Sequence, residues 1–184
     1  IVAIPGSLRR ESFSRQIADT LAELAPEGTE VEILQIGELP FFNEDLKADD
    51  SPQIVQDLAA RVSGADALVV ISPEYNRSMS GVLKNALDWL SKEPAAPLSG
   101  KPVEVITQSP GATGGLVANY SIRDVVSVCG AEVMTGFETA IGAVSTKVVD
   151  GKLSDPAARD FVAHKLRLLL DKADSVKAWK VAAE

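Results

Sequence analysis

Cysteine, histidine and aromatic residues are scarce in this chain, and their scarcity excludes several chemistries. The 184 residues include one cysteine, Cys129, one histidine, His164, and 5% aromatic residues. A lone cysteine can form neither an internal disulfide nor a thiolate cluster, and no set of His, Cys and carboxylate residues has metal-site spacing. The single histidine, which we expect on the surface of a helix, completes no Ser-His-Asp triad. The sequence therefore predicts no metal centre and indicates a reducing, cytoplasmic compartment.

Positive charge and long apolar runs are also limited. With 18 Lys and Arg residues against 26 Asp and Glu residues, the net charge is -8, which repels nucleic acid and anionic membrane surfaces. No apolar run approaches the roughly 20 residues of a membrane span, and no signal peptide precedes the first strand. Ile1 lies within that strand, so we expect residues to precede it. Small molecules are the expected partners, and any phosphate site must be local.

Apolar segments with strand-like and helix-like spacing alternate along the chain. The 46% hydrophobic content suits one domain spanning residues 1–184. After a short strand before Gly6, strands are predicted at 29–36, 67–71, 103–107 and 132–137. Helices are predicted around 17–24, 54–62, 83–90 and 118–129, and from 156 to about 181. The segment 138–153 lacks a clear period, apart from a turn at Asp150-Gly151.

This alternation predicts an α/β fold with a parallel sheet and right-handed crossovers. Five units at this length suit a flavodoxin-like, doubly wound, five-stranded parallel sheet of order 2-1-3-4-5, with helices on both faces. Glu30 and Glu32 alternate with inward Val31 and Ile33, as expected of an edge strand. Ligands of such sheets lie beyond the carboxyl ends of the strands. Three loops are therefore expected to converge there: Gly6–Ser14, Pro73–Ser80 and Ser109–Gly115.

The first of these loops has the composition of a phosphate cradle. Gly6 would let the backbone approach a ligand, Ser7, Ser12 and Ser14 offer hydroxyl groups, and Arg9 offers a guanidinium beside a helix N-terminus. The alternative is an ordinary strand-to-helix connection in which the serines cap the helix and the arginines are solvated. Taken alone, the loop leaves both interpretations open.

Together the three loops resemble the NADPH-dependent FMN reductase family, which includes bacterial quinone, chromate and azo-dye reductases. The resemblance covers nearly the whole chain, and its most specific part is Pro73-Glu-Tyr-Asn76 followed by the helix from Gly81 to Leu90. It implies bound FMN, NAD(P)H as co-substrate, and a ping-pong cycle that passes a hydride to a flavin, quinone, azo or oxyanion acceptor. It also implies a homodimer or homotetramer with the flavin near the interface.

The resemblance also implies a role for individual residues. Ser7, Arg9, Ser14 and the backbone before the first helix would hold the FMN phosphate. The ribityl chain and the isoalloxazine ring would be lined by Pro73, Glu74, Tyr75, Asn76, Ser109, Gly111, Gly114 and Gly115. No side-chain acid or base is required, so no catalytic residue is predicted.

Two positions depart from the family pattern. Ser80 stands where the family usually has proline, and Ser14 stands where many members have asparagine. Serine can cap a helix and donate to phosphate, so neither change removes the predicted function. Two interpretations of Arg77 stay open: its side chain contacts the phosphates of the nicotinamide dinucleotide, or it is a solvated surface side chain.

An electron-transfer flavodoxin without a substrate of its own is the alternative function. Such carriers cover the ring with aromatic residues from both flanking loops, whereas Tyr75 is the only aromatic residue of the second loop here and the third loop has none. This difference favours hydride exchange. A phosphoacceptor signalling domain would need clustered aspartates after the first strand, and a Rossmann dehydrogenase would need Gly-x-Gly-x-x-Gly there. This chain has Pro5-Gly6 at that place instead, which argues against both classes.

Four further positions carry structural expectations. Cys129 is predicted to pack in the core, and Trp89 to pack behind the flavin loop. Trp179 would mark the end of the final helix or a subunit contact. The pair Phe41-Phe42 is expected to be exposed at a loop tip, where it would cap the sheet or, as we favour, reach a partner subunit.

Overall fold

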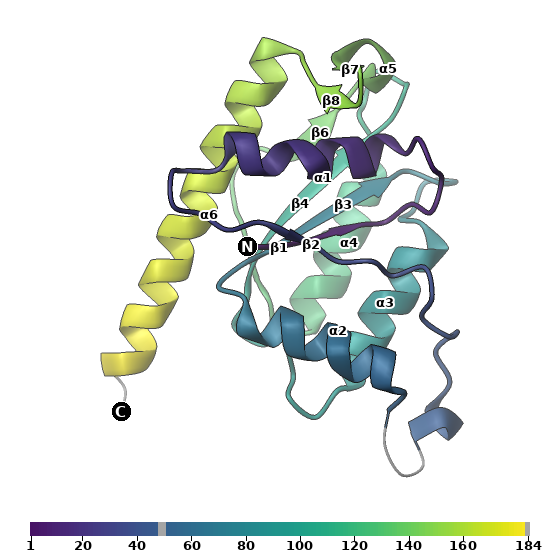
Figure 1. Cartoon of the computed structure of the whole chain (residues 1–184), viewed down its shortest axis with the longest axis vertical. Helices are drawn as coiled ribbons and strands as arrows, with labels where there is room; N and C mark the ends of the chain where they lie inside the picture. The colour runs from purple at the N-terminus through teal and green to yellow at the C-terminus, as the bar shows by residue number, and fades with distance from the viewer. Residues whose placement is uncertain (48–50, 183–184) are drawn as a thin grey trace.

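Parallel strands in the order β2-β1-β3-β4-β5 form the centre of the protein (Figure 1). The structure is a computed structural model that describes residues 1–47 and 51–182. The strands are β1 (Val2–Pro5), β2 (Glu32–Ile33), β3 (Leu68–Pro73), β4 (Pro102–Gln108), β5 (Glu132–Val133), β6 (Thr139–Ile141), β7 (Val148–Val149) and β8 (Lys152–Leu153). The helices are α1 (Phe13–Leu24), η1 (Glu44–Lys47), α2 (Gln53–Gly64), α3 (Gly81–Lys92), α4 (Leu116–Val128), α5 (Val144–Lys147) and α6 (Pro156–Ala182). The predicted flavodoxin-like strand order is confirmed.

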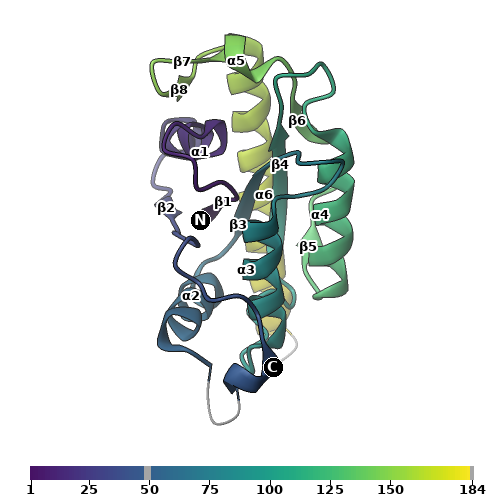
Figure 2. The ribbon, with the colours of Figure 1, turned by 90° about the vertical axis from the view of Figure 1, so that its right-hand side faces the viewer.

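Helices cover both faces of the sheet, as predicted. Figure 2 shows the sheet nearly edge-on, with α1 and α4 on opposite sides. Alternate residues of each strand enter two separate apolar cores: Leu68 and Val70 pack with α2, α3 and α4, whereas Val69 and Ile71 pack with α1 and α6. Because both faces of β3 are covered, its residues Leu68–Ile71 form a continuous apolar run without the alternation of a half-exposed strand.

The edge strand β2 is shorter than the predicted segment 29–36. The backbone carbonyls of Ile1 and Ala3 accept hydrogen bonds from the amides of Glu32 (3.0 Å) and Leu34 (2.8 Å). The backbone groups of the odd-numbered residues therefore point toward β2. The next β1 residue on that side is Pro5, which has no N–H group to donate. The ladder therefore stops, although Leu34 remains buried beyond it.

The predicted fifth strand at 132–137 is wrong in its extent. Only Glu132–Val133 pairs with β4 there; the chain then leaves the sheet and returns as Thr139–Ile141, which pairs with β4 again. Gly136 has φ +91° within the excursion, a conformation typical of a turn. The sheet thus has six strands instead of the predicted five, and part of the segment that lacked a clear period belongs to it.

Several smaller expectations can be compared with the structure. The turn at Asp150-Gly151 joins β7 to β8 with φ values of 50° and 81°, a type I′ hairpin as predicted. His164 is exposed on α6, as predicted. Cys129 is half-buried against the core, and burial raises the pKa of its thiol. Trp179, on the last turns of α6, is 72% exposed.

The aromatic pair at positions 41 and 42 is not exposed as a unit. Phe41 is 88% exposed, but Phe42 is half-buried and meets Trp89 edge-to-face with ring centroids 5.0 Å apart. Trp89 is fully buried and donates a hydrogen bond to the carbonyl of Pro40 at 2.8 Å. Trp89 therefore packs against the loop that follows β2. The last residues of that predicted loop, 48–50, lie outside the described residues.

No helix within residues 1–47 and 51–182 is both long and apolar enough to cross a membrane.

Candidate active site

The three predicted loops meet around a cavity of about 170 Å³ beyond the carboxyl ends of β1, β3 and β4. Its lining includes many of the predicted site residues and some others: Ser7, Arg9, Ser12, Phe13, Pro73, Glu74, Tyr75, Gln108, Ser109 and Pro110. The remaining predicted residues do not line it: Gly6, Ser14, Asn76, Gly111, Gly114 and Gly115. The convergence follows from the parallel topology, since the carboxyl ends of neighbouring parallel strands share one edge of the sheet.

The first loop offers free hydrogen-bond donors at the N-terminus of α1. Within the described part of the chain, the amides of Ser7, Leu8 and Arg9 donate no hydrogen bond. Ser12 caps α1 by accepting from the amide of Arg15 at 3.4 Å, so the capping interpretation is correct for this serine. The Arg9 guanidinium lies 5.5 Å from the centroid of the Phe13 ring. Free amides, a helix N-terminus and a guanidinium together favour an anion.

Gly6 packs closely against α3 and the Ser80 cap that precedes it. A Cβ atom at this position would lie 3.0 Å from the Leu83 Cβ and 3.1 Å from the Ser80 Oγ. The Ser80 hydroxyl donates to the Gly6 carbonyl at 2.5 Å and accepts from the Leu83 amide at 3.4 Å. Ser80 therefore caps α3, as predicted, and also connects the first loop to the second. The sequence reveals only the cap, because the contact with Gly6 joins distant segments.

Ser14 lies beneath the first loop and is fully buried. Its hydroxyl accepts a hydrogen bond from the Gln108 Nε2 at 3.2 Å. A contact between Ser14 and a phosphate therefore stays a prediction. Gln108, the last residue of β4, also lines the cavity, and sequence reasoning missed it because a single glutamine at a strand end carries no pattern.

The second loop contains a two-residue hairpin. The amide and carbonyl of Tyr75 pair with those of Ser78 at 2.9 and 3.0 Å. Between them, Asn76 and Arg77 have φ values of 51° and 66°, which form a type I′ turn. Asparagine tolerates this left-handed conformation, but arginine is strained in it. The hairpin leaves Tyr75 52% exposed at the mouth of the cavity.

Glu74 connects the second loop to the third. Its Oε2 accepts hydrogen bonds from the amides of Val117 and Ala118, both at 3.1 Å, at the N-terminus of α4. Gly115, the N-cap residue of α4, has no side chain with which to accept these bonds. A carboxylate here also interacts favourably with the helix dipole. The side chain predicted to line a flavin ring thus caps a helix in this structure.

The glycines of the third loop serve different purposes. A Cβ atom on Gly114 would lie 2.5 Å from the backbone carbon of Ala140 in β6, and one on Gly115 would lie 3.2 Å from the Glu74 Cβ. Both glycines are buried, with φ values of +63° and +79°. Gly111 is exposed, and a Cβ there would meet only the Ser109 Oγ, at 3.5 Å. Of these three, only Gly111 leaves open space for a ligand.

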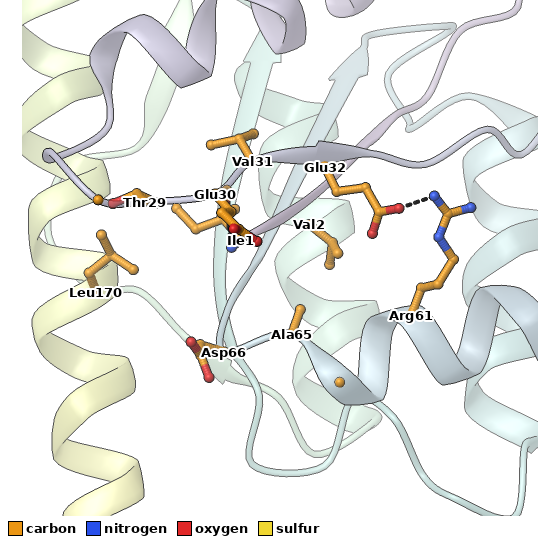
Figure 3. Close-up of a pocket in the computed structure, with 12 residues that line it drawn as sticks. Ile1, Val2, Thr29, Glu30, Val31, Glu32, Arg61, Ala65, Asp66 and Leu170 are labelled. Carbon is orange, nitrogen blue, oxygen red and sulfur yellow. Dashed lines mark hydrogen bonds and ion pairs between the residues drawn. The ribbon is translucent and has the colours of Figure 1, made fainter.

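A larger cavity of about 580 Å³ lies at the opposite edge of the sheet (Figure 3). The backbone nitrogen of Ile1 donates to the carbonyl of Glu30 at 2.8 Å there. Glu32 and Arg61 form an ion pair on its rim. The amino ends of strands are not where sheets of this topology bind ligands. Among the described residues, no three His, Cys, Asp or Glu side chains gather in a way that could hold a metal ion.

A doubly wound parallel sheet with unpartnered loop amides at the β1–β3 switch point defines a protein of the flavodoxin-like class. Comparison with known sequences specifies the family. The family model described as NADPH-dependent FMN reductase matches residues 1–146, and the chain belongs to this family. It is therefore an oxidoreductase.

Three known proteins illustrate the relationship. A quinone reductase of Escherichia coli is 38% identical over 170 residues, which cover 90% of each chain. An NAD(P)H-dependent FMN reductase of Pseudomonas aeruginosa is 34% identical over 170 residues, or 92% of each chain. Among solved structures, the flavoenzyme NAD(P)H:(acceptor) oxidoreductase FerB of Paracoccus denitrificans aligns with a TM-score of 0.84 and 32% identity, covering 95% of this chain and 96% of FerB.

Proposed function

We propose that this chain binds FMN in the cavity between the three loops and reduces small-molecule acceptors at the expense of NAD(P)H. Bound FMN would supply the redox chemistry, taking a hydride from NAD(P)H and passing it to a quinone, flavin, azo compound or oxyanion in a ping-pong cycle. The protein supplies binding, orientation and an electrostatic environment. The observation that carries the proposal is the set of unpartnered amides beside Arg9 at the N-terminus of α1.

The first loop fits the phosphate end of FMN. The amides of Ser7–Arg9 have no acceptor among the described residues and can donate to a phosphate, and the guanidinium of Arg9 supplies positive charge in a chain whose net charge is -8. A helix N-terminus alone contributes at most about 2 kcal/mol toward anion binding. Micromolar to nanomolar retention needs about 8 to 12 kcal/mol, so Arg9 and burial of the ring must contribute most of it.

The second and third loops fit the ring end. Pro73, Glu74 and Tyr75 form one wall, and Ser109 and Pro110 form the other, with Gly111 open beside them. Asn76 holds the hairpin that positions Tyr75, while Gly114 and Gly115 allow the third loop to pack on β6 and on Glu74. The third loop has no aromatic residue to stack on the ring, so one ring face stays open to exchange hydride. This observation favours the enzyme over an electron carrier.

We further propose a homodimer or homotetramer with the flavin near the interface, in the cytoplasm. Leu8 and Tyr75 border the site and are 62% and 52% exposed, and Phe41 is 88% exposed. Apolar side chains at this exposure are suited to contact with a second subunit. The half-buried free thiol of Cys129 suits a reducing compartment.

Replacement of Arg9 tests the phosphate site. Arg9→Ala removes hydrogen bonds to a charged group, typically about 1.5–3 kcal/mol, so we expect FMN to bind about 10- to 150-fold more weakly. The variant should purify folded, by circular dichroism, but largely without the flavin absorbance of the parent. Arg167→Ala, which removes an exposed arginine on α6, is the matched control and should retain flavin. Equal FMN occupancy in both variants would contradict the assignment.

An anaerobic absorbance experiment separates the enzyme from the carrier. NADPH or NADH is added to the flavin-loaded protein without air, and the flavin absorbance is followed. Rapid bleaching is expected of the enzyme, whereas a carrier would keep its oxidised spectrum. A protein that is colourless and cannot be reconstituted with FMN would defeat both functions.

A further inference from the structure

A third cavity, of about 430 Å³, lies on the other side of the first loop from the active-site cavity. Ser7 and Arg9 line both cavities, so only this short segment separates them. The opposite wall comes from Gln35 and Glu38, in the connection that follows β2. This third cavity is therefore adjacent to the site of the proposed reaction but distinct from it.

Arginine dominates the charge of this cavity. Arg9, Arg10 and Arg15 all line it, in a chain that carries 18 basic against 26 acidic residues. Arg10 is exposed and has no partner within the described part of the chain. The Nε of Arg15 donates to Asp19 at 2.8 Å, and the side chain stays 39% exposed. With Arg9 assigned to the active-site cavity, Arg10 and Arg15 remain for a second anionic group.

The rest of the lining suits a nucleoside. Leu8 is 62% exposed and offers an apolar surface on which a base can lie. The Gln35 amide can donate and accept, and the Glu38 carboxylate can accept from an amino group or a ribose hydroxyl. A carboxylate disfavours a bare anion, so the combination suits a ligand that is anionic at one end and a hydrogen-bond donor elsewhere.

We propose that this cavity binds the adenosine 2′-phosphate end of NADPH, with Arg10 and Arg15 at the phosphate, and so favours NADPH over NADH. The inference rests on the proposed function, which places the nicotinamide against the flavin on the other side of Ser7 and Arg9. Two planar guanidinium groups can bind the three oxygens of a phosphomonoester through paired hydrogen bonds. NADH has only a hydroxyl at this position, so it gains nothing from the two arginines.

Steady-state kinetics of the flavin-loaded enzyme with both nucleotides tests this proposal. Arg10→Ala and Arg15→Ala should each lower the ratio of kcat/KM for NADPH to kcat/KM for NADH by about 10-fold, the lower range for hydrogen bonds to charged groups. The double variant should lower the ratio further. Arg167→Ala removes the same charge far along the chain and should leave the ratio unchanged. A ratio that none of the cavity variants changes would overturn the proposal.

Inhibition by nucleotide fragments identifies the group that binds. The fragment 2′,5′-ADP should compete with NADPH, and the double variant should weaken this inhibition at least 10-fold. If 5′-ADP inhibits as well as 2′,5′-ADP, the cavity does not recognise the adenosine 2′-phosphate. The same conclusion follows if the substitutions weaken inhibition by inorganic phosphate as much as they weaken inhibition by 2′,5′-ADP. Flavin absorbance is recorded for every variant. Flavin loss from Arg10→Ala or Arg15→Ala would assign these arginines to FMN and overturn this proposal. A parent enzyme that binds no flavin, or that oxidises neither nucleotide, would instead count against the proposed function.

Discussion

The buried ion pair between Lys165 and Glu104 is expected to control both stability and its dependence on pH. The Lys165 Nζ lies 3.5 Å from the Glu104 Oε2, and the two side chains are 5% and 1% exposed. Thr139 donates to the other carboxylate oxygen at 2.6 Å. Lys165 also donates to the carbonyls of Thr135 and Phe137, both at 3.2 Å, in the excursion that divides the fifth strand. The pair therefore joins α6, β4 and β6.

Lys165→Met removes the ammonium and leaves the carboxylate buried. Breaking a buried pair in this way typically costs about 3–5 kcal/mol, and methionine preserves most of the side-chain volume. Burial raises the pKa of Glu104 in the parent, against the opposing effects of Thr139 and Lys165. Without Lys165 the opposition weakens, so the folded-state pKa should rise further above the unfolded value.

The sign of the pH effect follows from proton uptake. When the folded pKa of an acid is raised, the native state holds a proton that the unfolded state has already lost, so stability falls as pH increases through the interval between the two pKa values. The interval starts near the unfolded value of 4.5 and extends upward. The loss from Lys165→Met should therefore be largest at pH 8 and smaller at pH 5, where protonation partly neutralises Glu104.

Urea denaturation at pH 5 and pH 8 measures this difference. Fluorescence of Trp89, which is fully buried, reports unfolding. Adding Glu104→Gln to Lys165→Met removes the buried charge, keeps an acceptor for Thr139, and should restore more than half of the lost stability. If Lys165→Met costs less than about 1 kcal/mol at both pH values, the pair is solvated and the reasoning is refuted.

Two backbone substitutions test the loops around the cavity. Arg77→Gly should raise the free energy of unfolding by up to about 1 kcal/mol, because glycine relieves the backbone strain at φ +66°. The greater freedom of glycine in the unfolded chain offsets part of this gain. A variant less stable than the parent would contradict the prediction. Gly114→Ala should weaken FMN binding and destabilise the fold, because the new Cβ would lie 2.5 Å from the Ala140 backbone. Gly81→Ala serves as the control, because a Cβ at Gly81 has no neighbouring atom within 4 Å. Equal flavin titrations for the two alanine variants would show that the third loop adapts.

Much of the fold could be predicted because its signals are local. Apolar periodicity located α1, α2, α3, α4 and α6, and the hairpin at Asp150-Gly151 followed from a two-residue pattern. The strand order followed from the right-handed crossover rule and from the glutamates of the edge strand. The division of the fifth strand could not be predicted, because the carbonyls that leave the sheet are held by Lys165, distant in the sequence.

The sequence by itself determined which segments form strands and helices and that three polar loops meet at one edge of the sheet. Only the tertiary structure decided what each loop residue contacts. Gly6 accommodates α3, Glu74 caps α4, and Ser14 lies beneath the loop against Gln108. The physical reason is that periodicity and topology specify where a backbone runs, whereas hydrogen bonds between loops depend on side chains brought together from distant strands. Arg9 remains beside the free amides of the first loop, where both the pattern and the structure favour an anion.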